Sequence, residues 1–350
     1  MTGGEALLAE IREQPAAWRR LADAHEPITE LGARLARDRP ALVRLVGHGT
    51  SDHVAVYASY ALRLLCGWTA LGDAMSPALY YGVPAAAPGE VAIAFSQSGE
   101  TGDVVAWLRA AAETGARPVA VTNVAGSALA ASAPDATVLA HAGEERSIAA
   151  TKTYTGMLGA VALLGAGAAG RGAAMAAALR TAADATETAL PRLEADTARL
   201  AERFSDVQRL YVVARGVELA TADEVALKLT EVAYVSAKAL TATGMAHGPV
   251  AALEPGFPVW AVAGDDAALA AVAEAAARAR EAGAPVIATG PAAARIAGAA
   301  VTIPTPDAGE RLLAPLLSVL PGQLAARALA LAKGLDPGTP RHLRKVTSAA

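Results

Sequence analysis

The sequence predicts an α/β protein made of two similar halves, each a parallel sheet with helices on both faces. Three observations lead to this fold class. Short apolar runs alternate with segments of helical length, the alternation occurs twice, and both halves open with a strand that leads into a glycine-containing turn and a helix. Strands that are apolar throughout are typical of parallel sheets covered on both faces. A chain of 350 residues has room for two such domains.

The first half is expected at residues 40–170, after a helical segment at 1–39 in which Leu7, Ile11 and Trp18 recur at helical spacing. Its strands are predicted at 42–46, 91–95, 118–121 and 136–140, and its helices at 53–65, 102–114 and 150–168. The apolar run at 156–170 consists of small residues and is shorter than the ~20 residues that cross a bilayer, so we expect a buried helix there.

The second half is expected at residues 205–335, after connecting helices at 171–204. Its strands are predicted at 210–214, 259–262, 285–288 and 300–303, and its helices at 218–235, 267–281 and 310–333. Each half is then flavodoxin-like or nucleotide-binding-like, a class of sheet that binds ligands at the carboxyl ends of its strands. Two strand-to-helix turns of the first half are therefore the first places to look for a site.

Composition excludes several classes of partner. The net charge is −4 and only 4% of the residues are aromatic, so we expect no nucleic-acid partner. The lone Cys66 excludes an internal disulfide framework and a multi-thiolate site, which fits a cytoplasmic protein. The amino-terminal segment carries charges of both signs, and we expect no membrane segment. No histidines and carboxylates stand at metal-ligand spacing, so we predict neither a metal nor a cofactor.

Hydroxyl side chains follow two of the predicted strands. The first turn, "GHGTS", contains Gly49, Thr50 and Ser51, and the second, "SQSGET", runs from Ser96 to Thr101 just before a helix. Glycine lets a ligand approach the backbone, and the amino end of a helix attracts phosphate. The two turns therefore predict an anion site, although each hydroxyl alone is equally consistent with a helix cap. Neither turn carries a complete nucleotide-binding motif.

Acid/base candidates lie in the second half. Lys228 and Glu231 are three residues apart on one helical face with apolar flanks, which leaves open either a surface ion pair or a proton-transfer group. His247 stands before a Gly-Pro turn and is a further acid/base candidate. Glu100, Asp103, Glu144 and Glu145 are interpreted as helix-end or surface groups.

Six stretches then occur in one order along nearly the whole chain: "GTSD", "FSQSGETGDV", "SIAATKTYTGML", "ALKLTEVAY", "HGPVAAL" and "PRHLRKVT". Together they resemble the sugar isomerase (SIS) family, in particular the isomerase half of glucosamine-6-phosphate synthase and the stand-alone aminosugar-phosphate deaminases and isomerases. The resemblance implies two SIS subdomains, a homodimer, and a tail at 336–350 that closes the active site.

The resemblance also implies roles for single residues. The phosphate of a hexosamine 6-phosphate would be bound by Ser51, Ser96, Gln97, Ser98 and Thr101, and the sugar by Gly49, Thr50, Ile148, Ala149 and Ala150. Glu231 would move a proton between carbons 1 and 2 with help from Lys228, and His247 would open the ring from the neighbouring subunit. Lys345 matches a lysine that contacts the open-chain sugar.

Departures from the family pattern leave the reaction open. No glutaminase segment precedes the resemblance, so the degradative direction is expected: deamination and isomerisation of glucosamine 6-phosphate to fructose 6-phosphate and ammonia. Lys238, Gly244 and Ala150 replace polar or acidic family residues near the sugar. A less polar pocket at the amine suits an N-acetylated sugar. The alternative to deamination is therefore a 2,3-dehydratase that acts on N-acetylglucosamine 6-phosphate. A sugar-phosphate sensor without catalysis is the other alternative.

Overall fold

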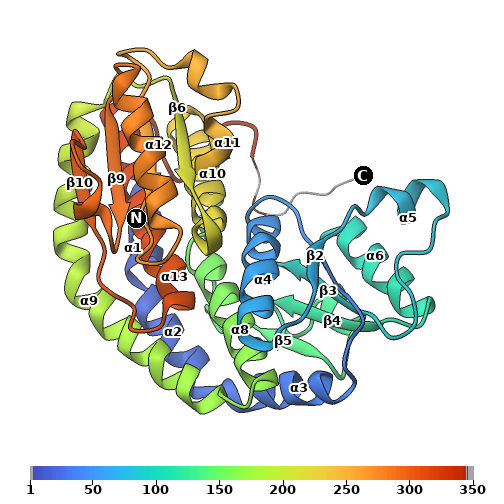
Figure 1. The fold of residues 1–350 in the computed structure, drawn as a ribbon. Helices are drawn as coiled ribbons and strands as arrows, with labels where there is room; N and C mark the ends of the chain where they lie inside the picture. Colours follow the sequence, from blue (N-terminus) through green and yellow to red (C-terminus); the bar gives the residue numbers. More distant parts are fainter. Residues whose placement is uncertain (1–2, 344, 346–350) are drawn as a thin grey trace. The chain divides into compact units, whose positions relative to one another are not determined.

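The computed structural model describes residues 3–343 and Lys345, and it groups them into two compact units. The first-sheet unit comprises residues 16–145 and 152–180 with Lys345, and the second-sheet unit comprises residues 3–15, 146–151 and 181–343. Each unit contains a five-stranded parallel sheet with helices against it, which confirms the predicted fold class (Figure 1). Residues 344 and 346–350 of the predicted tail lie outside the described residues.

The first sheet has the strand order β2-β1-β3-β4-β5. Its strands are β1 (Val43–Val46), β2 (Ala70–Gly72), β3 (Val91–Ser96), β4 (Arg117–Thr122) and β5 (Thr137–Leu139). The helices of this part of the chain are α2 (Gln14–Asp23), α3 (His25–Arg37), α4 (Thr50–Cys66), α5 (Ser76–Tyr81), α6 (Gly102–Glu113), α7 (Ala128–Ala131) and α8 (Lys152–Ala168). Strand β3 is buried along its whole length, as expected for the centre of a covered parallel sheet.

Helices α3 and α8 pack with their backbones nearly in contact. A Cβ atom on Gly32 would lie 2.1 Å from the carbonyl oxygen of Leu164, and one on Gly167 would lie 2.2 Å from that of Thr29. Residues 152–167 of α8 are all buried, so the apolar run is a buried helix as predicted. Among the described residues, one helical stretch, 311–332, is long and apolar enough to cross a bilayer, but 83% of its apolar window is buried inside the structure, as in a core helix.

The second sheet has the order β10-β9-β8-β6-β7. Its strands are β6 (Arg209–Ala214), β7 (Ser236–Thr241), β8 (Val259–Val262), β9 (Val286–Gly290) and β10 (Val301–Pro304). The α-helices of this part are α1 (Gly3–Arg12), α9 (Gly172–Arg203), α10 (Leu219–Ala233), α11 (Ala242–Met245), α12 (Leu269–Glu281), α13 (Ala314–Ser318) and α14 (Leu320–Ala332). Four 3-10 turns complete it: η1 (Gly216–Glu218), η2 (Pro249–Ala252), η3 (Ala293–Arg295) and η4 (Arg311–Leu313). Counted along the chain, the two sheets share one strand order, which confirms the predicted internal repeat.

Each sheet has one strand more than predicted. The three-residue β2 is too short to stand out in the sequence, and β7, "SAKALT", is partly exposed at the sheet edge and lacks the apolar run of a central strand. The preceding helix ends at Ala233 because Tyr234 adopts a left-handed φ of 53°, two residues before the predicted end. The predicted helix at 310–333 is in fact η4, α13 and α14 in succession.

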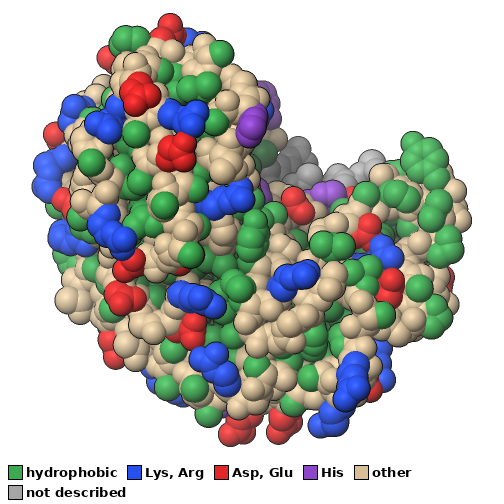
Figure 2. Space-filling view, in the orientation of Figure 1, with side chains coloured by type: hydrophobic (Ala, Val, Ile, Leu, Met, Phe, Trp, Pro, Cys, Tyr) green, Lys and Arg blue, Asp and Glu red, His purple; other side chains and the backbone are tan. Residues whose placement is uncertain are grey.

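One part of the first-sheet unit exposes large apolar side chains. Tyr80 and Tyr81 of α5 are 70% and 78% exposed, and Val83 just beyond them is 51% exposed. Figure 2 shows hydrophobic side chains gathered over this segment.

Candidate active site

The two hydroxyl-containing turns lie at the same edge of the first sheet. Strands β1 and β3 are parallel neighbours, with Val46 opposite Ala94, so the turns that follow them emerge side by side. The chain goes from β1 to β2 on one side and then to β3 on the other. The strand order reverses there, and such a switch point is where doubly wound sheets bind their ligands.

The first turn needs glycine for its shape. A Cβ atom on Gly47 would lie 2.6 Å from the backbone of Ser51, and Gly49 has a positive φ of 53°. These conformations bring the start of α4 close to the strand end, and they leave Ser51 mostly buried. His48 Nε2 lies 2.5 Å from Asp103 Oδ2, so a hydrogen-bonding contact joins the first turn to the start of α6. Asp103 was interpreted as a helix-end or surface group, and this contact gives it a definite partner.

The second turn is organised by its own hydroxyls. Ser96 Oγ lies 3.0 Å from Thr101 Oγ1 and accepts a hydrogen bond of 3.1 Å from the Gly99 amide. Ser98 Oγ accepts one of 3.2 Å from the Glu100 amide. Thr101 occupies the N-cap position of α6, but its side chain makes no capping hydrogen bond. The helix-cap alternative therefore does not describe Thr101.

This turn retains donors for an anion. Ser96 and Thr101 share one hydrogen bond and Ser98 accepts one, so among the described residues one proton of the first pair and the Ser98 proton have no acceptor. The first amides of α6 also lack intrahelical partners by the geometry of a helix. A phosphate is matched to such a set of donors at a helix amino terminus. Gln97, which lies between the two serines, is half-buried.

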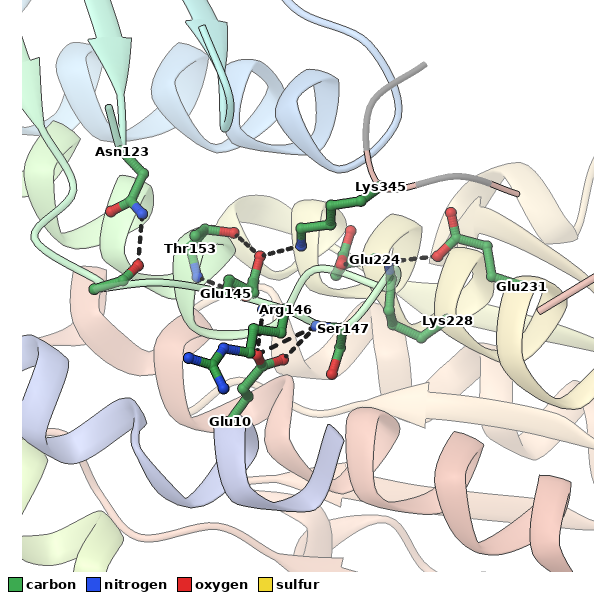
Figure 3. A network of polar contacts seen from close by, with 11 residues as sticks. Glu10, Asn123, Glu145, Arg146, Ser147, Thr153, Glu224, Lys228, Glu231 and Lys345 are labelled. Atoms are coloured by element: carbon green, nitrogen blue, oxygen red, sulfur yellow. Dashed lines mark hydrogen bonds and ion pairs between the residues drawn. The ribbon is translucent and has the colours of Figure 1, made fainter. Parts of the chain in front are cut away.

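The Lys228 side chain lies between two carboxylates on α10. Its Nζ is 2.6 Å from Glu231 Oε2 and 3.4 Å from Glu224 Oε1. Lys228 and Glu224 are buried, whereas the Glu231 side chain is 23% exposed. Figure 3 shows Lys228 next to Glu231 on α10. The surface ion pair left open by the sequence is therefore wrong, because the ammonium group is inside the unit.

Glu231 is held by one oxygen only. Among the described residues, Oε1 of this carboxylate accepts no hydrogen bond, while Oε2 is fixed by Lys228. A carboxylate with one anchored and one open oxygen has a defined orientation and can still accept a proton.

Sequence reasoning missed Glu224. It is fully buried, and its charge compensates that of Lys228 from the opposite side of Glu231. The signal was present, since Glu224, Lys228 and Glu231 follow one another at spacings of four and three residues, which places them on one face of a helix.

His247 lies in the turn that follows α11. Its amide donates to the Gly244 carbonyl over 3.1 Å, and among the described residues its exposed ring makes no hydrogen bond. The structure describes no contact between this ring and Glu231. A side chain at position 244 would be crowded, because a Cβ atom on Gly244 would lie 2.6 Å from Thr241 Oγ1. Lys238 is exposed on β7.

Of the two interpretations of Glu145, a surface group or a helix-end group, the surface one is wrong and the helix-end one fits, because its partner Thr153 lies in the first turn of α8. The Glu145 side chain is fully buried, and it accepts hydrogen bonds from the Thr153 amide at 3.2 Å and hydroxyl at 2.6 Å. Lys345 Nζ lies 3.3 Å from Glu145 Oε2, so the one described residue of the tail's end reaches this carboxylate (Figure 3). Ile148, Ala149 and Ala150 belong to the irregular loop 146–151, which is grouped with the second-sheet unit.

The second sheet has a carboxylate at its own switch point. Glu218 follows β6 and is fully buried, with hydrogen bonds of 2.6 Å from Thr221 and 2.8 Å from Ser318. Burial raises the pKa of Glu218 to about 7, and the nearby charge of Asp266 acts in the same direction. A Cβ atom on Gly264 would lie 3.2 Å from Glu218 Cγ, so this edge is closely packed.

Within residues 3–343 and Lys345, no three His, Cys, Asp or Glu side chains form a group that fits a metal ion. The absence of a metal or cofactor from the reaction stays a prediction.

Comparison with known proteins identifies the family. The model of the SIS domain matches residues 43–166 and 203–333, which together are most of the chain. The chain belongs to the SIS-domain family. The predicted resemblance is thereby confirmed. Each matched segment contains one of the two sheets.

The names of several relatives of this SIS-domain protein are those of enzymes that act on sugar phosphates. The isomerizing glutamine–fructose-6-phosphate aminotransferase of Aeropyrum pernix is 35% identical in an alignment 364 residues long, which covers 98% of this chain and 57% of that protein. The chain thus spans little more than half of such relatives. The C-terminal domain of the Francisella tularensis glucosamine-fructose-6-phosphate aminotransferase has 26% identity and a TM-score of 0.87, covering 96% of this chain and 98% of that domain. A Silicibacter pomeroyi protein with a provisional name as a phosphosugar isomerase has 33% identity and a TM-score of 0.83, covering 96% of this chain and all of that one.

Proposed function

We propose that this SIS-domain protein is an enzyme that deaminates and isomerises a hexosamine 6-phosphate, with glucosamine 6-phosphate as substrate and fructose 6-phosphate and ammonia as products. The observation that carries the proposal is the state of Glu231, with Oε2 held by Lys228 at 2.6 Å and Oε1 open. A binding protein has no use for a carboxylate prepared in this way. The named relatives, which are aminotransferases of fructose 6-phosphate by name, support a hexose 6-phosphate as the substrate class.

The phosphate is assigned to the two turns of the first sheet. Ser51, Ser96, Gln97, Ser98 and Thr101 supply hydroxyl and amide donors at a switch point, where a phosphate ester is bound without a metal. Gly49 and Thr50 are assigned to the adjoining sugar carbons, and Ile148, Ala149 and Ala150 to the amine end.

The reaction needs one ring opening and one proton shift. His247, supplied by the neighbouring subunit of a homodimer, takes the proton of the carbon-1 hydroxyl and returns it to the ring oxygen, which gives the open-chain aldehyde. Lys345 contacts this aldehyde. Glu231 then removes the proton from carbon 2 and delivers it to carbon 1, while a proton passes from the amine nitrogen to the carbon-1 oxygen. Carbon 1 thereby becomes an alcohol and carbon 2 an imine. Water adds to the imine and ammonia leaves, so that glucosamine 6-phosphate and water become fructose 6-phosphate and ammonia.

Lys228 acts on the base rather than on the substrate in this scheme. Its buried ammonium group fixes Glu231, and Glu224 balances its charge from the other side. The proposal therefore assigns catalysis to Glu231 and His247, and orientation of the base to Lys228.

The decisive experiment replaces Glu231 with glutamine. The wild-type chain should release ammonia and fructose 6-phosphate from glucosamine 6-phosphate, and E231Q should lose turnover by about 10²- to 10⁴-fold while it still binds inorganic phosphate. The matched control is E202Q, on the exposed end of α9, which should keep full activity. Full activity of E231Q would refute the assigned base.

Assays with glucosamine 6-phosphate and with N-acetylglucosamine 6-phosphate distinguish the deaminase from the two alternatives, a dehydratase and a sensor. An ultraviolet-absorbing product from N-acetylglucosamine 6-phosphate, without ammonia from the free amine, would assign the chain as a 2,3-dehydratase, which the replacement of a hydroxyl by Ala150 favours. Binding of both sugars without turnover of either would make it a sensor.

A further inference from the structure

The loop 146–151 has no regular secondary structure, yet part of it is buried. Ser147 and Ala149 are 4% and 2% exposed. Both neighbouring residues in the chain, Glu145 and Lys152, are grouped with the first-sheet unit, whereas the loop itself is grouped with the second-sheet unit. Backbone amides that are buried outside a helix or sheet need another acceptor.

Glu10 of α1 supplies that acceptor. Its Oε1 accepts hydrogen bonds from the Arg146 amide at 2.5 Å and the Ser147 amide at 3.2 Å, and its Oε2 lies 3.2 Å from the same Ser147 amide (Figure 3). The Glu10 side chain is buried, at 5% exposure. An ionised carboxylate only accepts hydrogen bonds, so it is well matched to two successive amide donors, and such charge-assisted bonds are the strong ones.

Glu10 stands on a fixed support within the second-sheet unit. Near the end of α1, Gln14 donates to the Ile11 carbonyl over 3.1 Å and to Gln323 Oε1 over 2.8 Å, and both glutamines are buried. At the beginning of α1, Arg327 donates to the Gly4 carbonyl over 2.6 Å. Helix α1 is therefore attached to α14 at both ends, and the carboxylate between these attachments has a defined position.

We propose that Glu10 is a positioning residue for the sugar end of the substrate. By binding the first two amides of the loop, it fixes the backbone that presents Ile148, Ala149 and Ala150. It thereby controls the affinity for the sugar and not the affinity for the phosphate. The inference rests on the proposed function, because the assignment of these three residues to the sugar does.

The test uses the variants E10Q and E10A in the full chain. E10Q keeps the size of the side chain and one acceptor oxygen, so it separates loss of the contact from a failure to fold. The control is E13Q, an exposed glutamate one helical turn further along the same segment. Two quantities are measured: hydrogen exchange of the amides in 146–151, and the dissociation constants for glucosamine 6-phosphate and for inorganic phosphate.

The proposal expects faster exchange at residues 146–147 in both variants, and a dissociation constant for glucosamine 6-phosphate raised about tenfold, the effect of one charge-assisted hydrogen bond. Affinity for inorganic phosphate should stay within about twofold of the wild type. Unchanged exchange of the loop in E10A, or equal loss of affinity for both ligands, would overturn the positioning role. If the wild-type chain binds inorganic phosphate but no hexosamine 6-phosphate, the proposed function itself fails and this inference falls with it.

Discussion

Replacing Glu218 with glutamine should change how the stability of the second-sheet unit depends on pH. The wild-type carboxyl is fully buried and receives hydrogen bonds from Thr221 and Ser318, and burial raises its pKa from an ordinary 4.5 to about 7. The glutamine amide has nearly the same shape and still reaches both hydroxyls, but it cannot ionise.

The direction follows from proton binding. Between pH 4.5 and 7 the folded state holds a proton on Glu218 that the unfolded state has released, so the free energy of unfolding falls as the pH rises and levels off above 7. Each pKa unit corresponds to about 1.4 kcal/mol, so the full loss is about 3 kcal/mol. E218Q should therefore exceed the wild type in unfolding free energy by about 1 kcal/mol at pH 5 and about 3 kcal/mol at pH 8.

Urea denaturation followed by circular dichroism between pH 5 and 8.5 measures this difference, with E202Q as the exposed control. Parallel pH profiles of the wild type and E218Q would refute the reasoning, because they would mean that Glu218 ionises in the folded state as easily as in the unfolded chain.

Three further predictions concern the site and the packing around it. K228M leaves the buried Glu224 without its cation and should lower the unfolding free energy by about 3–5 kcal/mol, and the added change E224Q should recover part of this loss in the same denaturation assay. T101V removes one donor from the anion site and should weaken competitive inhibition by inorganic phosphate about tenfold with little change in melting temperature; an unchanged inhibition constant would contradict the assignment. G32A forces a Cβ atom to within 2.1 Å of the Leu164 carbonyl and should destabilise the protein by several kcal/mol, whereas G126A, which meets nothing within 4 Å, should leave the melting temperature unchanged.

Much of the fold was accessible from the sequence because the central strands are uniformly apolar. The runs around Val91 and Val259 stood out, and the turns after the predicted strands at 42–46 and 91–95 indicated where the candidate site lies at the first sheet. The edge strands β2 and β7 were not predicted, since one is three residues long and the other is partly exposed along its whole length. Edge strands carry a weaker hydrophobic signal than central ones.

The candidate site was predictable where its contacts join residues close in sequence, and less so where they join distant segments. Glu231 and Lys228 lie within one helical turn, so their pairing was visible, although not the burial of the lysine. The contacts of Glu145 with Lys345 and of Glu10 with Ser147 join positions more than a hundred residues apart. A carboxylate in such a contact is indistinguishable in the sequence from a solvated one, because only the folded chain decides which charges lose their water.

The repeated strand order gives this chain two topologically equivalent switch points, and they differ in the residue that follows the first strand of each sheet. The fourth residue after β1 is Thr50, next to Ser51, and the fourth residue after β6 is Glu218. A hydroxyl at this position can donate a hydrogen bond to an anion, whereas a buried carboxyl occupies the space and, when ionised, repels an anion. The two copies of one strand order therefore differ at an equivalent position: the turn after β1 carries hydroxyls that can donate to an anion, whereas the corresponding place after β6 is occupied by a buried carboxyl.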